Sequence, residues 1–143
     1  MKKTTTHNEK ETLAYGVALG RACRGGEVFV LIGELGAGKT KLAQGLAAGL
    51  GVKSRVNSPT FNILKLYKIS KRGFEIKYFC HIDAYRLKSE KELSALGVKE
   101  IFNSPETVTV IEWAEKVKKI WPRRVRVMRI KYLNNSRREI VLK

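Results

Sequence analysis

Residues 33–40 read Gly-Glu-Leu-Gly-Ala-Gly-Lys-Thr, which fits the pattern Gly-x-x-x-x-Gly-Lys-Ser/Thr of a phosphate-binding loop. The apolar run Val28–Ile32 precedes this loop and is typical of a strand buried on both faces of a parallel sheet. A helix over Lys39–Leu50 is expected to follow, with Gly51 ending it. This order predicts an α/β fold of the P-loop NTPase type, with three layers in which helices flank a central mixed β-sheet.

The residue types of the loop suit the binding of a nucleoside triphosphate. Its glycines allow the backbone to turn tightly, so that successive N–H groups point at phosphate oxygens, and the helix that follows adds its positive N-terminal end. Lys39 is expected to reach the β- and γ-phosphates, and Thr40 to offer its hydroxyl to Mg²⁺. The predicted ligand is therefore ATP with Mg²⁺. The loop residues predicted to bind it are Gly33, Glu34, Leu35, Gly36, Ala37, Gly38, Lys39 and Thr40.

Two acidic residues stand where predicted strands end. Asp83 follows the apolar run 78–82, and Glu112 follows Val108–Ile111. The carboxyl ends of parallel strands meet at the ligand side of such a sheet, which favours a role for both acids beside the phosphates. Spacing alone leaves open which of them binds the metal and which orients an attacking water.

The remaining elements complete one predicted domain over residues 1–143. A first helix over His7–Arg24 is capped by Thr6 or Asn8 and ended by Gly25-Gly26. The other predicted elements are a hairpin of Phe61–Ser70 and Phe74–Ile82 turning at residues 71–73, a helix over Ser89–Leu96 with Ser89 and Glu92 as a capping box, and a last hairpin of Arg124–Leu133 and Glu139–Leu142.

The formal net charge is +16, which predicts attraction to polyanions such as nucleic acid or an acidic protein face. A solvated basic surface with no such partner is the competing interpretation. Arg124, Arg126 and Arg129 are expected to share one face of a strand, where they would serve contact with such a polyanion.

The cysteines and the apolar runs indicate a soluble cytoplasmic protein. Cys23 and Cys80 lack metal-ligand spacing and are expected to be buried in reduced form. No apolar region of a secretory signal follows the basic N-terminus, and no apolar run is long enough to span a membrane.

Several motifs beyond the phosphate loop resemble one family, the TsaE (older name YjeE) ATPases needed for threonylcarbamoyladenosine formation in tRNA. Their order and spacing cover residue 8 to about residue 138. After the loop come Ser58-Pro59-Thr60-Phe61, His81-Ile82-Asp83-Ala84-Tyr85-Arg86-Leu87, Leu96-Gly97 and Glu112-Trp113.

The resemblance implies roles for single residues. Thr40 and Glu112 would be the Mg²⁺ ligands, and Asp83 would lie close by in a catalytic centre with Lys39. Thr60 would belong to a switch segment near the γ-phosphate. The stretch near Glu9 would pack beside the base, and a nucleotide-contacting arginine of the last hairpin would be Arg137, or Arg138 if the register slips by one.

The resemblance also implies an activity and partners. Members of the family act with a TsaB–TsaD heterodimer, which carries out the threonylcarbamoyl transfer, and their ATP hydrolysis is thought to reset that complex; contact with tRNA would pass through it. Two alternatives are a small-molecule or nucleotide kinase on the same fold and a nucleic-acid-binding module. No lid-like insertion for an acceptor is evident in the sequence, and the basic residues form no recognisable nucleic-acid motif.

Overall fold

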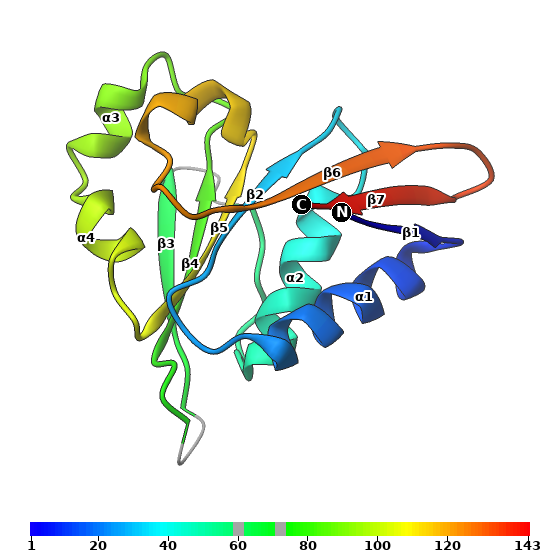
Figure 1. The fold of residues 1–143 in the computed structure, drawn as a ribbon, viewed down its shortest axis with the longest axis horizontal. Helices are drawn as coiled ribbons and strands as arrows, with labels where there is room; N and C mark the ends of the chain where they lie inside the picture. Colours follow the sequence, from blue (N-terminus) through cyan, green and yellow to red (C-terminus); the bar gives the residue numbers. More distant parts are fainter. Residues whose placement is uncertain (59–61, 71–73) are drawn as a thin grey trace.

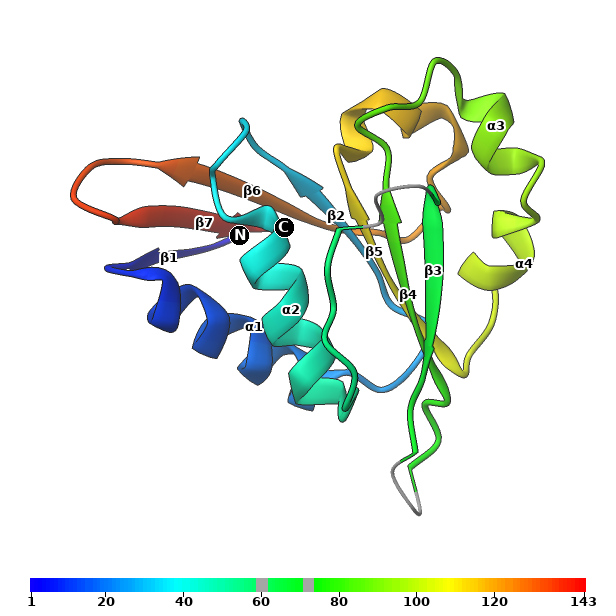
Figure 2. The ribbon, with the colours of Figure 1, turned by 180° about the vertical axis from the view of Figure 1, so that it is seen from behind.

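The computed structural model describes residues 1–58, 62–70 and 74–143. A seven-stranded sheet of order β1-β7-β6-β2-β5-β4-β3 forms its centre. The long helices α1 and α2 cover one face of the sheet, and the short helices α3, α4 and η1 cover the other (Figures 1 and 2). The predicted α/β fold with a flanked mixed sheet is confirmed.

The sheet has a parallel centre and antiparallel edges. Strand β2 runs parallel to β5 and to β6, and β5 runs parallel to β4, whereas β3, β7 and β1 pair antiparallel with their neighbours. The strands are β1 Lys2–Thr6, β2 Val28–Ile32, β3 Leu64–Lys68, β4 Tyr78–Asp83, β5 Thr107–Glu112, β6 Arg126–Tyr132 and β7 Arg138–Leu142. The helices are α1 Glu9–Ala22, α2 Lys39–Leu50, α3 Glu90–Ser94, α4 Val98–Phe102 and the 3₁₀ helix η1 Ala114–Ile120.

Side-chain alternation along β2 divides the interior into two cores. Phe29 and Leu31 pack in the cluster that includes the apolar face of α2. Val28 and Val30 point the other way, into the cluster that α3, α4 and η1 complete. A strand with apolar residues at every position is thus explained by burial on both faces, and its C-terminal end is fixed firmly where the phosphate loop begins.

Helices α1 and α2 touch through glycines. A Cβ atom added to Gly45 would lie 2.2 Å from the carbonyl oxygen of Leu13, and one added to Gly16 would lie 2.5 Å from that of Leu42. Only glycine allows two helix backbones to approach this closely. The contact sets the position of the N-terminal end of α1 relative to the phosphate loop that precedes α2.

Several predicted elements are confirmed with shifted ends. Helix α1 begins after Asn8, whose side-chain oxygen accepts a hydrogen bond from the backbone N–H of Glu11 at 2.8 Å, so Asn8 rather than Thr6 is the cap. Strands β3 and β4 form the predicted antiparallel pair, although the turn at residues 71–73 lies outside the described residues. The expected capping box of α3 is wrong: the Glu92 carboxylate accepts from the N–H of Lys88 at 3.4 Å, and no side-chain bond caps at Ser89.

Three elements were not predicted from the sequence. Strand β1 consists of lysines and threonines without an apolar pattern, and it exists through its pairing with β7. Helix α4 has only five residues and begins directly after Gly97, which had indicated an end of helical structure. Helix η1 follows Trp113 and is a 3₁₀ helix with a kink at Val117.

The expectation that three arginines share one face of a strand is wrong. Arg124 precedes β6 and is not part of it. Arg126 and Arg129 are an odd number of residues apart, so strand alternation places them on opposite faces. The Arg126 guanidinium lies 5.1 Å from the centre of the Phe29 ring, whereas Arg129 is exposed.

Cys23 and Cys80 are both buried free thiols, as expected, and burial raises the pKa of each to about 12. In the part of the chain that the structure describes, each helix is too short or too polar to cross a membrane.

Candidate nucleotide-binding site

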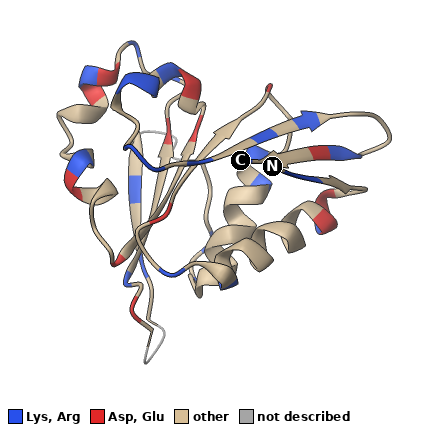
Figure 3. Cartoon of the chain, in the orientation of Figure 1, with Lys and Arg blue, Asp and Glu red and all other residues tan. Residues whose placement is uncertain are grey.

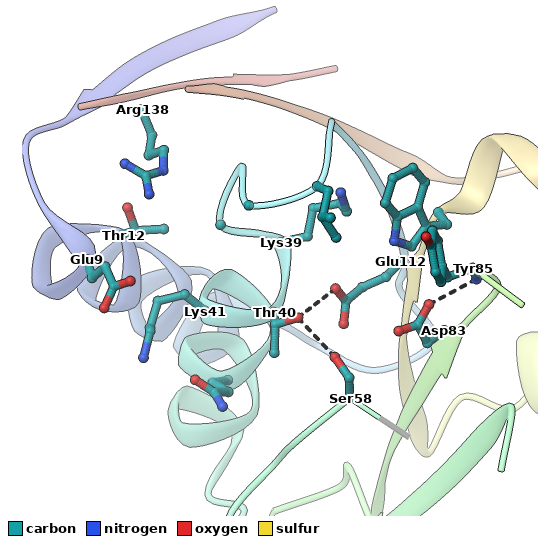
Figure 4. A pocket seen from close by; sticks show the side chains of 15 residues that line it. Glu9, Thr12, Lys39, Thr40, Lys41, Ser58, Asp83, Tyr85, Glu112 and Arg138 are labelled. Carbon is teal, nitrogen blue, oxygen red and sulfur yellow. Dashed lines mark hydrogen bonds between the residues drawn. The ribbon is translucent and has the colours of Figure 1, made fainter. Parts of the chain in front are cut away.

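A cavity of about 380 Å³ opens where β2, β4 and β5 end, a volume within the range of small-molecule sites. Its described lining comes from the start of α1, the phosphate loop, α2, the ends of β4 and β5, and β7. Figure 4 shows Glu9, Thr12 and Arg138 at one end, Asp83 and Tyr85 at the other, and Lys39 and Thr40 between them. The described lining residues are Glu9, Thr12, Leu35, Gly36, Gly38, Lys39, Thr40, Lys41, Gln44, Ser58, Asp83, Tyr85, Glu112, Trp113 and Arg138.

The phosphate loop has the backbone conformation that its glycines permit. Gly38 has φ +107° and is the N-cap of α2, where no side chain bonds to the free N–H groups of the first turn. A left-handed residue with no side chain leaves these donors open toward the cavity, and the positive end of the α2 dipole points at the same place. The loop can therefore bind an anion.

The ammonium group of Lys39 is held against its own loop. It donates hydrogen bonds to the carbonyl oxygens of Gly33 and of Glu34, the latter at 2.9 Å, and lies 4.0 Å from the centre of the Trp113 ring. Lys39 is only 5% exposed, and burial lowers its pKa although the carboxylate of Glu112 opposes that shift. A cation so placed satisfies its hydrogen bonds with carbonyl oxygens, for which phosphate oxygens can substitute.

Thr40 and Glu112 meet across the cavity floor. The Thr40 hydroxyl donates to Oε1 of Glu112 at 2.9 Å and lies 3.0 Å from the hydroxyl of Ser58 (Figure 4). The second oxygen of Glu112 lies 2.5 Å from Nε2 of His81, which is fully buried. Each carboxylate oxygen of Glu112 thus has one polar partner, which fixes the plane of the group.

Asp83 lies beside Glu112 because their strands are parallel neighbours and the two residues are register partners. Its Oδ1 accepts a hydrogen bond from the backbone N–H of Tyr85 at 3.0 Å (Figure 4). Burial raises the pKa of Asp83, and the nearby carboxylate of Glu112 adds to the shift. The predicted convergence of the two strand-end acids is confirmed, while their separate roles remain predictions.

At the other end of the cavity, Arg138 connects the last strand to the phosphate loop. Its Nε donates to the carbonyl oxygen of Ala37 at 2.9 Å, and its guanidinium lies 4.6 Å from the centre of the Tyr132 ring. Glu9 lines this end of the cavity, and the contact with a base that the resemblance implies stays a prediction. Arg137 instead is exposed and donates to the side chain of Asn134, so the register that places Arg138 at the site is the one observed.

Not every predicted site residue lies at this cavity. Gly33, Glu34 and Ala37 line a second cavity, of about 500 Å³, on the β6 side of the loop. Thr60 lies outside the described residues. Analysis of the sequence missed Thr12, Tyr85 and Trp113 as lining residues, although Tyr85 and Trp113 closely follow the two strand-end acids.

The donor set fits Mg²⁺. A hydroxyl and a carboxylate, Thr40 and Glu112, are the hard oxygen ligands that this ion takes, and it draws the rest of its shell from phosphates and water. The two groups lie 2.9 Å apart, so one ion could contact both by replacing the hydrogen bond between them. Among the described residues there is no group of three or more His, Cys, Asp or Glu side chains that could hold a metal.

Comparison with known proteins gives a consistent result. A family model described as "Threonylcarbamoyl adenosine biosynthesis protein TsaE" matches residues 6–140. The chain is 34% identical to the tRNA threonylcarbamoyladenosine biosynthesis protein TsaE of Treponema pallidum, over 98% of both chains. It is 36% identical to the protein of the same name from Bacillus subtilis, over 96% of this chain and 82% of that one.

The fold agrees with that of a solved relative. The crystal structure of Bacillus subtilis YdiB superimposes with a TM-score of 0.76 and 30% sequence identity, covering 99% of this chain and 83% of that chain. The region of this chain that the family model matches contains the phosphate loop, both strand-end acids and Arg138. This chain therefore belongs to the TsaE family of threonylcarbamoyl adenosine biosynthesis proteins.

Proposed function

We propose that the chain is a Mg²⁺-dependent ATPase that supports threonylcarbamoyladenosine modification of tRNA by acting on a TsaB–TsaD complex, hydrolysing ATP to ADP and phosphate. The observation that carries the proposal is the meeting of the Thr40 hydroxyl and the Glu112 carboxylate, at 2.9 Å, beside the phosphate loop and Lys39. This arrangement combines an anion site with a cation site in one cavity. A nucleoside triphosphate with its metal ion requires both.

The chain's own groups would bind and orient the nucleotide. The open N–H groups around Gly38 donate to phosphate oxygens, and the Lys39 ammonium exchanges the carbonyls of Gly33 and Glu34 for the β- and γ-phosphates. Arg138 and Glu9, at the far end of the cavity, lie where the nucleoside would extend.

Thr40 and Glu112 would hold the Mg²⁺ ion, which neutralises charge on the phosphates when it is bound. Asp83 adjoins Glu112 but bonds only to a backbone N–H among the described residues. Its second oxygen is therefore available to accept a hydrogen bond from a water molecule and to orient that water toward the γ-phosphate. Trp113 and Tyr85, whose rings lie 5.0 Å apart, line this end of the cavity.

The positive groups of the described lining are Lys39, Lys41 and Arg138. Arg138 is the one arginine among the described lining residues, and its Nε is engaged by the carbonyl oxygen of Ala37. An arginine that reaches the γ-phosphate accelerates hydrolysis by about 10³–10⁵-fold in other P-loop proteins, and it is sometimes supplied by a partner. We therefore expect slow hydrolysis by the isolated chain and faster hydrolysis with the partner pair.

Steady-state hydrolysis at saturating ATP–Mg²⁺ tests the proposal. The chain is measured alone, with a TsaB–TsaD pair and with small-molecule or nucleotide acceptors. Stimulation by the protein pair, with release of phosphate to water, supports the proposal. Transfer of phosphate to an acceptor indicates a kinase instead, and turnover by the chain alone that equals turnover by the mixture contradicts dependence on the partner.

A further inference from the structure

A third concave surface, after the two at the phosphate loop, lies between α4 and the segment that joins η1 to β6. It encloses about 580 Å³ and shares no described lining residue with the nucleotide cavity. Gly26, at its edge, precedes β2, whereas the phosphate loop follows β2, so the length of that strand separates the two sites. We call this surface the η1–β6 groove and define it by Lys99, Phe102, Lys119, Trp121, Arg123 and Arg124.

The η1–β6 groove is strongly cationic. Lys99, Arg123 and Arg124 are exposed and have no carboxylate partner among the described residues, and no Asp or Glu belongs to the described lining. Figure 3 shows basic residues on α4 and along the segment that leads into β6. Lys119 makes one contact, at 3.7 Å to Glu90, and its side chain is 86% exposed. Lys99, Arg123 and Arg124 are therefore compensated mainly by solvent ions, which a polyanion would displace.

Apolar rings line the same groove. The indole of Trp121 is held by a hydrogen bond from its Nε1 to the carbonyl oxygen of Ala114 at 2.9 Å, and the residue is partly exposed. Phe102 lies beneath, only 6% exposed. The Trp121 ring packs partly against the core, and its centre lies 6.0 Å from the Lys118 ammonium. Its exposed part, in the same lining as the two arginines of the groove, suits stacking of a base together with bidentate binding of a phosphate.

We propose that the η1–β6 groove binds the sugar–phosphate backbone and an unstacked base of RNA. An acidic protein surface would satisfy the cations but would make no use of the exposed part of the Trp121 ring, whereas a base could stack there. The relatives' names also place this family in the modification of tRNA, which is itself such a polyanion. The inference extends the proposed function by assigning an RNA contact to this chain, and it does not depend on ATP hydrolysis.

The test measures binding of a labelled tRNA transcript to the full chain by fluorescence anisotropy at 50 and 200 mM salt. One variant carries Lys99→Gln, Arg123→Gln and Arg124→Gln. The control carries Arg21→Gln, Lys53→Gln and Lys68→Gln, which remove the same charge from exposed residues outside both cavities. Loss of three phosphate contacts should make the affinity of the groove variant roughly 40-fold less sensitive to this change of salt, because each contact contributes about 0.9 to the slope.

The inference is supported if the groove variant loses both affinity and salt dependence and the control retains them. Equal losses in the two variants would overturn it, since binding would then reflect overall charge. Preferential competition by poly-glutamate over poly(U) would also overturn it, because the groove would then recognise an acidic protein. Binding of a fluorescent ATP analogue, measured in parallel, should be unchanged in both variants; its absence even in the unmodified chain would contradict the ATPase proposal and not this one.

Discussion

His81 Nε2 lies 2.5 Å from Glu112 Oε2, and neither side chain is more than 3% exposed. His81 Nδ1 has no hydrogen-bond partner among the described residues, and a carboxylate oxygen accepts hydrogen bonds, so Nε2 carries the N–H that is donated to Glu112. Because Thr40 occupies the other oxygen of Glu112, His81 determines how that carboxylate faces the proposed metal position.

Replacement of His81 should therefore raise the Mg²⁺ requirement of nucleotide binding. We expect His81→Phe, which removes the donor, to increase the half-saturating Mg²⁺ concentration by about 10-fold or more. His81→Gln, which retains an N–H donor, should have a half-saturating Mg²⁺ concentration close to that of the unmodified protein. Titration of Mg²⁺ against binding of a fluorescent ATP analogue measures the effect, with nucleotide affinity in EDTA as the reference.

The matched control for His81 is Phe79→Leu. Phe79 is fully buried on the same strand and stacks on the His81 ring with centroids 6.2 Å apart, but its register partner on β5 is Val108 and not Glu112. Its replacement should lower the melting temperature without changing the Mg²⁺ requirement. An unchanged Mg²⁺ requirement in His81→Phe would contradict the prediction, and His81 would then contribute only to the packing of the core.

Lys39→Ala should abolish turnover. Loss of a group that stabilises charge in the transition state costs about 10²–10³-fold in kcat, and ATP binding should weaken as well. The fold should persist, because the Lys39 ammonium hydrogen-bonds to carbonyls of its own loop and contacts the Trp113 ring at the cavity rather than in the core. Turnover and circular dichroism of Lys39→Ala are compared with those of Lys10→Ala, an exposed lysine of α1. Normal hydrolysis by the Lys39 variant would refute the site.

The two strand-end acids should differ in their effects. Glu112→Gln should weaken nucleotide binding in Mg²⁺ more than in EDTA, because it removes a charged ligand. Asp83→Asn keeps the acceptor for the Tyr85 N–H and should lower turnover with a smaller change in affinity. Titrations with the nucleotide, with and without Mg²⁺, measure both variants, and the reverse pattern would exchange the two roles.

Asp83 should also make the nucleotide-free protein less stable at neutral pH. Its pKa is raised above the ordinary value of 3.8, chiefly by burial, so the folded state binds the proton more tightly than the unfolded state. The resulting stability is complete below the unfolded pKa and is lost as pH rises through the folded pKa. Asp83→Asn should therefore melt at a higher temperature than the unmodified protein at pH 7, and the difference should vanish as pH falls below about 4.

The control for this pH dependence is Glu100→Gln, which changes an exposed acid. Its melting temperature should follow that of the unmodified protein at each pH. A lower melting temperature of Asp83→Asn at pH 7 would show that the carboxylate stabilises the fold.

Gly45→Ala should destabilise the protein by about 1–3 kcal/mol, the usual cost of an extra methyl group in a filled interior. The new Cβ would lie 2.2 Å from the carbonyl oxygen of Leu13, so the two long helices would have to move apart. Thermal unfolding measures the loss. Ala48→Ser, on an exposed position of the same helix, should change stability by about 0.5 kcal/mol or less.

The centre of the molecule was more predictable from sequence than its edges. The phosphate loop, β2 and α2 carry local signals, and the acids Asp83 and Glu112 end apolar runs, so parallel pairing was enough to bring them together. Strand β1 has no such signal, because its pairing with β7 depends on residues distant in the chain. The same is true of Arg138, whose bond to Ala37 joins positions 101 residues apart.

The hydrogen bond between His81 and Glu112 could not be predicted from the sequence either. His81 belongs to a strand that is apolar on both sides, and nothing in the local sequence shows that its ring points at the end of a neighbouring strand. Long-range packing, rather than local preference, selects that partner.

The order of the strands has a consequence for synthesis on the ribosome. Strand β1 is made first, but its sheet neighbour is β7, the last strand to emerge. Arg138, on the same late strand, completes the contact with the phosphate loop. The nascent chain can therefore close this sheet edge and the cavity at the phosphate loop only after β7 has left the exit tunnel.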